Sequence, residues 1–408
     1  MSCEKPLPVG MSSPDSFARY TFEKRFPSII QSVHTTAKLK EDSPEAENLK
    51  ALLGSAGKGE IRDPFAEDGF TCLFDRSLFL SEELTAWREE IARYAGLTWR
   101  EAPFYFAEAY LYLNILIASG YYTPTSGNFR VDPYQSSKEA ELARFLAAPE
   151  TGKLLERFEE KAVEKELFAD ALLFMLKANR IDLSNAAIAA AGRELIHKMD
   201  RSDLLVDHTD ALAGCVYASG RVDIILDNAG AELAADLVFV RLYLASRADR
   251  RITLHAKASP TFVSDAMPKD IAFAIAAMKK FSVFRKTGEA LEEFLASGRL
   301  KVLEHYFWNG PKHFPEMPPR LREELCASDI CILKGDANFR RLIEDRAWPF
   351  DTDLSLLTSW FPGNFAVLRT LKSEVAADIP PELSARLNRE DPSWLTNGRW
   401  GYVRLVGV

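Results

Sequence analysis

The feature that most constrains the fold is an alternation of short apolar segments with amphipathic segments, which runs from about Tyr217 to the C-terminus. Short apolar runs are typical of buried strands, and apolar residues three or four positions apart are typical of helices. The expected strands are 222–226, 251–256, 300–307, 330–333, 367–371 and an edge-like 402–406. The expected helices are 231–244, 269–281, 319–328 and 339–347. This alternation predicts crossover connections and a mostly parallel sheet.

The first half of the chain has a different pattern. Helical spacing of apolar residues is found in 81–94, 107–118, 137–147 and 152–176, and 123–134 is expected to be a loop because it holds Pro124, Gly127 and Pro133. The expected fold class is α/β, with a mostly parallel, Rossmann-like three-layer sheet in the C-terminal half and a largely α-helical N-terminal region before it. We expect residues 1–212 to form the helical region, packed over a cleft, and residues 213–408 to form the α/β domain.

Composition limits the classes of partner. The net charge of −8 argues against bulk binding of nucleic acid, whose phosphates favour a basic face. No apolar run approaches the roughly 20 residues of a membrane span, and the N-terminus lacks a secretory pattern. The five cysteines are odd in number and lack CxxC spacing, which favours reduced thiols over disulfides or zinc. We therefore expect a cytoplasmic protein without a nucleic-acid or membrane partner; the oligomeric state is not indicated.

Polar side chains gather where the expected strands end. In open α/β sheets, ligands bind outside the carboxyl ends of the strands. The residues that follow four of the expected strands are Asp227 and Asn228; Asp265; Lys334, Asp336, Asn338 and Arg340; and Arg369, Thr370 and Lys372. The sequence therefore predicts that these side chains share one edge of the sheet.

The residue types at that edge fit a single chemistry. Asp227, Asn228 and Asp265 offer hard oxygen ligands, which suit Mg²⁺ or Mn²⁺. The lysines and arginines, among them Lys334 and Arg369, are donors of the kind that phosphate requires. A divalent cation beside such donors stabilises charge on a transferring phosphoryl group.

Each of these motifs also has a purely structural interpretation. Asp227 and Asn228 are common in turns and helix caps, and Asp265 could cap the helix that begins near Pro268. The segment 334–336 could be a solvated turn, and Arg369 with Lys372 could be a surface face. Their occurrence at successive strand ends is what favours a site.

These segments resemble the damage-control phosphatase family, also known as domain of unknown function 89, and within it the acidic residue methyltransferase 1-like subfamily. The matching stretches are LDNAGAELAADL (226–237), FVSDA (262–266), LKGDANFRRL (333–342) and LRTLKSE (368–374), with further similarity in SFARYTFEKRFPSII (16–30) and DPSWLTNGRWG (391–401). The similarity is spread over most of the chain and is densest in the C-terminal half.

The resemblance implies a metal site at Asp227, Asn228 and Asp265, which would take Mn²⁺ or Mg²⁺ and in some members Co²⁺ or Ni²⁺. It implies substrates that are small phosphorylated metabolites, such as fructose 1-phosphate or fructose 6-phosphate. It also implies phosphate and sugar contacts from a second set of residues: Lys334, Asp336, Asn338, Arg369, Thr370 and Lys372, together with Glu108 and Asn179 from the helical half.

The chain departs from the subfamily pattern at two places. Lys177 and Ala178 stand where the subfamily has Trp and Gly before Asn179 and Asp182. Leu113 and Asn114 stand where it has two arginines after a Glu-x-Tyr-x-Tyr motif. Because a lost arginine could change which phosphosugar fits, the resemblance carries over the metal chemistry and not the choice of substrate.

The resulting hypothesis is a metal-dependent phosphomonoester hydrolase in which Asp227, Asp265, Lys334 and Asp336 are catalytic. Either water or an aspartate carboxylate could be the nucleophile. One alternative is an S-adenosylmethionine-dependent protein carboxyl O-methyltransferase, which the single glycine of 227–230 does not favour. The other is a non-catalytic metabolite-binding relative.

Overall fold

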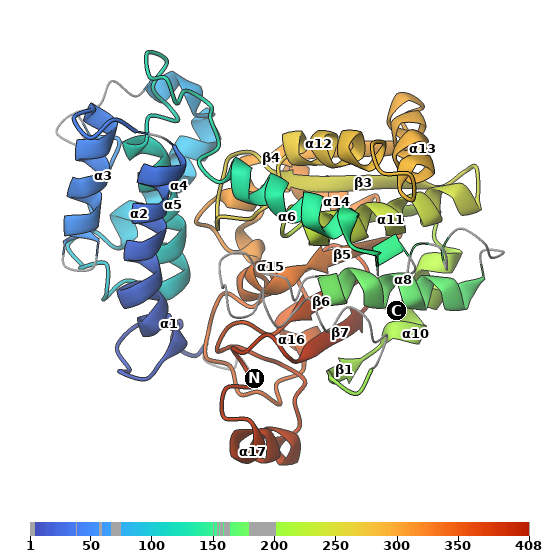
Figure 1. Ribbon diagram of the computed structural model, residues 1–408. Helices are drawn as coiled ribbons and strands as arrows, with labels where there is room; N and C mark the ends of the chain where they lie inside the picture. Colours follow the sequence, from blue (N-terminus) through green and yellow to red (C-terminus); the bar gives the residue numbers. More distant parts are fainter. Residues whose placement is uncertain are drawn as a thin grey trace.

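The computed structural model describes residues 5–37, 39–56, 59–66, 75–149, 151–152, 155, 158, 164–178 and 201–407. Its centre is a seven-stranded sheet in the order β1-β7-β6-β5-β2-β3-β4. The strands are β1 (Leu204–Asp207), β2 (Arg221–Ile225), β3 (Arg251–Lys257), β4 (Leu300–His305), β5 (Ile330–Lys334), β6 (Phe365–Thr370) and β7 (Gly401–Val406). Figure 1 shows helices on both sides of this sheet, which gives the three layers of the predicted fold class.

The direction and order of the strands create a switch in the middle of the sheet. All neighbouring pairs are parallel except β6 and β7, which are antiparallel. From β2 the chain adds β3 and β4 on one side, and it then returns to place β5 and β6 on the other side. The carboxyl ends of β2 and β5 therefore flank the point where the strand order reverses, which is where open α/β sheets bind ligands.

Helices of the C-terminal half cover the sheet. They are α10 (Thr209–Ala218), α11 (Ala231–Ser246), α12 (Pro268–Met278), α13 (Arg285–Ala296), α14 (Pro319–Cys326), α15 (Gly335–Leu342), α16 (Leu354–Leu357) and α17 (Pro381–Glu390). Helix α11 is almost entirely buried, because it packs between β3, α8 (Lys165–Ala178) and α13. Two apolar clusters on opposite faces of the sheet hold these layers together.

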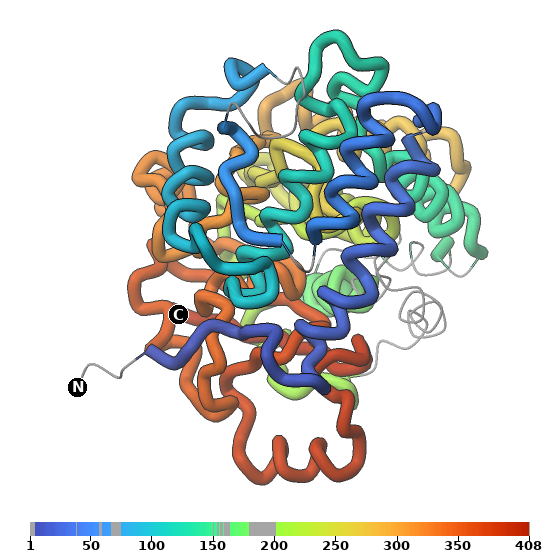
Figure 2. Tube along the Cα trace, turned by 90° about the vertical axis from the view of Figure 1, so that its left-hand side faces the viewer, coloured from blue at the N-terminus to red at the C-terminus, as the bar shows by residue number. Residues whose placement is uncertain are grey.

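The N-terminal helices form a separate apolar cluster beside the sheet. They are α1 (Phe17–Tyr20), α2 (Phe26–Thr36), α3 (Pro44–Ser55), α4 (Ser81–Arg93) and α5 (Phe104–Ala118), and every residue of α5 is buried. Figure 2 shows them lying in front of the α/β region. Phe262 and Val263, which follow β3, pack against this cluster, so the helices contact a strand-end loop.

Helix α6 (Gln135–Ala147) joins the two parts. Figure 1 shows it extending from the N-terminal helices along the α/β region, and it contacts α11 and α12. In the part of the chain that the structure describes, no helix is long and apolar enough to cross a membrane.

Most predicted elements lie within a few residues of their expected positions. The predicted helix 152–176 differs, since α8 starts at Lys165 and Glu164 is not helical. The predicted strand 300–307 ends at His305, after which Tyr306–Asn309 forms a 3₁₀ turn. The predicted helix 339–347 is instead α15, which starts directly after β5 because Gly335 adopts a φ of +81° and ends before Glu344 and Asp345, whose φ values are also positive. Strand β1, at residues 204–207, was not predicted. It lies before residue 212, where we expected the helical region to end, and that domain boundary stays a prediction.

Candidate metal and phosphate site

Four strand ends meet at the switch between β2 and β5. Asp227 and Asn228 follow β2, and Asp265 ends the loop after β3. Lys334 is the last residue of β5 and Asp336 lies in the first turn of α15, while Arg369 and Thr370 end β6. All are buried, with exposed fractions of 8% or less. The structure thus brings together the strand-end residues that the sequence pattern singled out.

Main-chain hydrogen bonds lock Asp227, Asn228 and Asp265 together. Asn228 and Asp265 form an isolated antiparallel bridge, in which Ala229 N donates to Ser264 O (2.7 Å) and Ala266 N donates to Asp227 O (2.8 Å). The Asn228 amide donates to Asp227 Oδ2 (2.9 Å), and its Oδ1 accepts from the Ser264 hydroxyl (2.5 Å). Neither aspartate is a simple helix cap, since Met267 caps α12 and Gly230 caps α11.

Asp227 carries the most unfavourable charge in this group. Burial raises its pKa well above the ordinary range, and the neighbouring Glu232 and Asp265 carboxylates raise it further. The charges of Lys257 and Lys372 oppose that rise. Gly335 makes the close approach possible, because a Cβ atom there would lie 1.8 Å from Asp227 Oδ2. The start of α15 is therefore built directly against the Asp227 carboxylate.

Lys334 is held on all sides by the protein. Its ammonium is fully buried and contacts Asp236 Oδ1 (2.6 Å), Glu232 Oε1 (3.0 Å) and Met175 O (3.2 Å). An ammonium has three donors, and these three acceptors account for them. Despite burial, which lowers the pKa of Lys334, the two carboxylates leave it raised. Lys334 therefore supports Glu232, which in turn accepts from the Asn228 amide (2.9 Å).

A second lysine, Lys257 at the end of β3, pairs with the Asp265 carboxylate at 3.0 Å. Both side chains are almost fully buried. Burial raises the pKa of Asp265, while Lys257 lowers it. The lysine therefore balances one of the carboxylates that the sequence pattern assigned to a metal.

The α15 and β6 side of the site offers donors. Arg369 lies 3.0 Å from Asp336 Oδ1 and donates to Val375 O (2.9 Å), and its guanidinium stacks 4.0 Å from the Phe339 ring centroid. Its Nε and Nη1 groups have no hydrogen-bond partner among the described residues, although the side chain is 1% exposed. Buried donors of this kind favour a ligand that accepts hydrogen bonds. Lys372 joins this side, since its backbone N–H donates to Asp336 Oδ1 (3.2 Å).

The remaining predicted contacts have other partners. The Asn338 amide donates to Lys334 O (2.8 Å) and Leu226 O (3.1 Å), so it ties β5 to the end of β2. Glu108 forms an ion pair with Arg340, which also binds Asp345 through two hydrogen bonds. Thr370 is buried at the end of β6. Asn179 and Asp182 lie outside the described residues. The substrate contacts of all these residues stay predictions.

The oxygen donors suit a hard divalent cation. No group of three or more His, Cys, Asp or Glu side chains within the described ranges is arranged to hold a metal ion. The candidate metal ligands at this edge are instead two aspartates, Asp227 and Asp265, and the Asn228 amide, which donates a hydrogen bond to Glu232. Crowded buried carboxylates of raised pKa are stabilised by a nearby cation, so the residues present fit a divalent ion.

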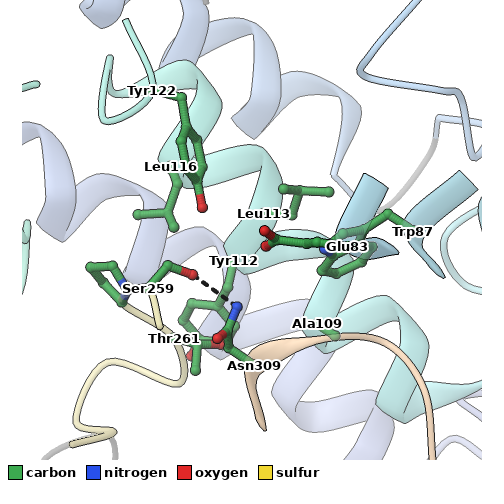
Figure 3. Close-up of a pocket in the computed structure, with 11 residues that line it drawn as sticks. Glu83, Trp87, Ala109, Tyr112, Leu113, Leu116, Tyr122, Ser259, Thr261 and Asn309 are labelled. Carbon is green, nitrogen blue, oxygen red and sulfur yellow. Dashed lines mark hydrogen bonds between the residues drawn. The ribbon is translucent and has the colours of Figure 1, made fainter. Parts of the chain in front are cut away.

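Two hollows flank the loop after β3 and are distinct from this site. Figure 3 shows one between α4, α5 and this loop, where the Asn309 amide donates to Ser259 Oγ (2.9 Å); its volume of about 10 Å³ is that of one water. The other, of about 420 Å³, is lined by residues that include Tyr121, Arg130 and His305. Neither is lined by Asp227, Asp265 or Lys334.

Sequence reasoning missed the residues that support the site. Glu232 and Asp236 lie four and eight positions after Asn228, a spacing that puts both on one face of α11. Lys257 could have been found as the polar last residue of an apolar strand. Lys138 and Glu141 of α6 gave no signal, because they are more than 80 residues from the loops they contact.

The fold and the site define a class: an α/β protein with buried carboxylates and cations at the switch point of its sheet. The damage-control phosphatase ARMT1-like domain family matches residues 21–387, and the chain belongs to that family. It is 28% identical to damage-control phosphatase ARMT1 of Danio rerio, over 96% of this chain and 94% of the relative. With the protein of the same name from Rattus norvegicus, identity is 26% over 99% of both chains.

A solved structure supports the fold. The crystal structure of a DUF89 family protein from Pyrococcus horikoshii aligns with a TM-score of 0.50 and 16% identity, over 95% of this chain and 97% of that one. At this level of identity the similarity concerns the fold alone.

Proposed function

We propose that this protein is a metal-dependent phosphatase that hydrolyses small phosphorylated metabolites, in particular sugar phosphates such as fructose 1-phosphate or fructose 6-phosphate, in the cytoplasm. The relatives' printed name, damage-control phosphatase, supports this activity. The observation that carries the proposal is the concentration of buried carboxylates around Asp227 at the switch point, together with the Arg369 donors that have no hydrogen-bond partner among the described residues.

The charge balance supports a divalent cation together with a phosphate. The carboxylates of Asp227, Glu232, Asp236, Asp265 and Asp336 face the cations of Lys257, Lys334, Lys372 and Arg369. These five anions and four cations leave about one negative charge. A phosphate monoester would add roughly two more. A divalent cation would offset most of the sum.

The proposed roles follow from the contacts. Asp227, Asn228 and Asp265 would hold the cation, which when bound would polarise the phosphoryl group and stabilise its charge. Arg369 and Lys372 would bind phosphate oxygens from the α15 side. Lys334 would act through Glu232 and Asn228, because its donors are already used.

Asp336 lies between Arg369 and the backbone of Lys372, where it would orient both donors or carry a proton. Glu108, Asn179, Asn338 and Thr370 are proposed contacts of the substrate. Mn²⁺ or Mg²⁺ fits the oxygen donors best; Co²⁺ or Ni²⁺ are further candidates.

The test measures phosphate release from a panel of sugar phosphates with Mn²⁺, Mg²⁺, Co²⁺, Ni²⁺ or EDTA. We expect release that depends on the added cation and is abolished by EDTA. Asp227→Ala should abolish it and weaken the heat of Mn²⁺ binding. Full turnover by Asp227→Ala with added Mn²⁺ would refute the assignment.

A second measurement in the same series separates the alternatives. If the wild-type protein releases no phosphate but binds S-adenosylmethionine in calorimetry, a methyltransferase would replace the proposal. If it binds sugar phosphates without turning them over, it is a metabolite-binding protein.

A further inference from the structure

Helix α6 places two charged side chains, one turn apart, on the two loops that hold the proposed metal ligands. Lys138 and Glu141 are both buried, with exposed fractions of 2% and 5%. Residues three positions apart lie on the same face of a helix. That face of α6 is turned toward α11 and α12, which begin directly after the two loops.

Lys138 holds the Asp265 loop. Its Nζ donates to the backbone carbonyl of Asp265 (2.7 Å) and to one carboxylate oxygen each of Asp132 (3.0 Å) and Asp270 (3.0 Å). The same Asp270 oxygen accepts from Met267 N (2.9 Å) at the start of α12. All three donors of the ammonium are therefore used, one on the Asp265 carbonyl and one on the carboxylate that also accepts from the start of α12.

Glu141 holds the Asp227 loop. Its Oε1 accepts a hydrogen bond from Ala231 N (3.1 Å), the first residue of α11. A Cβ atom on Gly230, whose φ is +71°, would lie 2.7 Å from the Glu141 carboxyl carbon. The carboxylate therefore occupies the N-terminus of α11 at a distance that only glycine permits.

We propose that Lys138 and Glu141 are positioning residues that set the spacing of the Asp227–Asn228 loop relative to Asp265, and thereby the affinity of the divalent cation. This inference rests on the proposed function. The two loops are joined by the hydrogen bonds between Ala229 and Ser264 and between Ala266 and Asp227, and α6 holds each of them from outside. Partners that support metal ligands in this way typically change metal affinity 10- to 100-fold when removed.

The first test compares Lys138→Met with Lys269→Met. Lys269 contacts Asp132 (3.1 Å) in the same ion cluster, and no contact to Asp265 accompanies it, so this variant is a matched control. We expect Lys138→Met to weaken Mn²⁺ binding at least 10-fold in calorimetry and to speed hydrogen–deuterium exchange in residues 261–266. Lys269→Met should stay within about 2-fold of the wild type. Wild-type Mn²⁺ affinity in folded Lys138→Met would overturn the proposal.

The second test covers the case in which Lys138→Met does not fold, since it leaves Asp132 and Asp270 with less charge compensation. Glu141→Ala removes the acceptor for Ala231 N, whereas Glu141→Gln keeps a side-chain oxygen there. We expect Glu141→Ala to weaken Mn²⁺ binding at least 10-fold and Glu141→Gln to restore it to within about 3-fold of the wild type. Equal, wild-type affinity of both would overturn the proposal.

The two proposals fail differently. A wild-type protein that binds Mn²⁺ and releases phosphate, combined with unaffected α6 variants, would reject the positioning role alone. A wild-type protein that binds no divalent cation would reject the proposed function and this inference with it. The exchange rate of residues 261–266 is read without metal, so it also separates loop support from global unfolding.

Discussion

Strand β2 contains one buried aspartate, Asp223, and is followed by another, Asp227. In the middle of the strand, Asp223 is bound by Arg221 through two hydrogen bonds (2.8 and 3.0 Å) and contacts His255 Nε2 (3.0 Å), and Arg221 also pairs with Glu324. At the carboxyl end, Asp227 lies four residues further on, beside two other carboxylates, and its pKa is raised well above the ordinary range by burial and by those neighbours.

The two aspartates differ in how far the protein compensates their buried charge, and this difference separates a stabilising role from a functional one. Asp223 has a partner of opposite charge, Arg221, on its own strand and a hydrogen-bonding imidazole, His255, on β3. The charges of Lys257 and Lys372 oppose the rise in the pKa of Asp227, which nevertheless stays raised. Buried carboxylates that remain crowded despite this cost are typical of sites that bind a cation or move a proton. The two aspartates should therefore respond differently to mutation.

The largest expected effect is that of Asp227→Asn. Phosphate release should fall at least about 1,000-fold, because a ligand for the cation is lost. The metal-free variant should nevertheless unfold at a higher temperature than the wild type at pH 8. Because the folded pKa of Asp227 is raised, the wild type loses stability as the pH rises above its unfolded pKa, so this advantage should be small at pH 4. A variant less stable than wild type at pH 8 would contradict the comparison.

Gly335→Ala should be nearly as damaging to activity. The added Cβ would lie 1.8 Å from Asp227 Oδ2, and the φ of +81° disfavours alanine, so the carboxylate or α15 must shift. A shift of this size costs about 100-fold in turnover. Gly54→Ala in α3 is the control, since nothing lies within 4 Å of its Cβ and activity should be unchanged. Equal turnover of both variants would show that the contact with Asp227 is unimportant.

Asp223→Asn should have the opposite effect, with a loss of stability and little loss of activity. Removing one partner of a buried ion pair costs about 3–5 kcal/mol. Because Arg221 keeps Glu324 as its second carboxylate partner, we expect a loss of about 3 kcal/mol or less. Denaturant unfolding should show this loss. Phosphate release by the folded fraction should stay within about 3-fold of wild type. If activity fell as far as in Asp227→Asn, the two aspartates would not have separate roles.

The smallest effect concerns Glu83 of α4, which lies in the hollow of Figure 3, away from the site. Burial raises the pKa of Glu83 to about 7. The folded protein therefore loses stability as the pH rises from about 4.5 to 7, and Glu83→Gln should remove that loss. We expect a gain of about 1–2 kcal/mol at pH 8 and almost none at pH 4.5, with unchanged phosphate release. A gain that does not depend on pH would argue against the shifted carboxyl.

Much of the fold could be predicted, because its signals are local. The strands β2, β3 and β5 are rich in apolar residues, and a parallel sheet brings their carboxyl ends to one edge whatever the detailed packing. Strand β1 was missed because its four residues at the sheet edge are only half-buried and carry little pattern. The start of α15 was missed because it depends on a positive φ at Gly335.

The part of the candidate site that directly follows strands could be predicted in the same way. The positions of Asp227, Asn228 and Asp265 after two strands could be predicted from the amino-acid sequence, because the pattern of apolar residues indicates where a strand ends. The partners of the buried charges depend on the tertiary structure. Lys334 contacts Glu232 and Asp236, and Lys257 pairs with Asp265. Lys138 and Glu141 hold the two loops from α6. The physical reason is that a buried charge takes whichever opposite charge or hydrogen-bonding group lies within about 3 Å, and such neighbours can be any number of residues away in the chain.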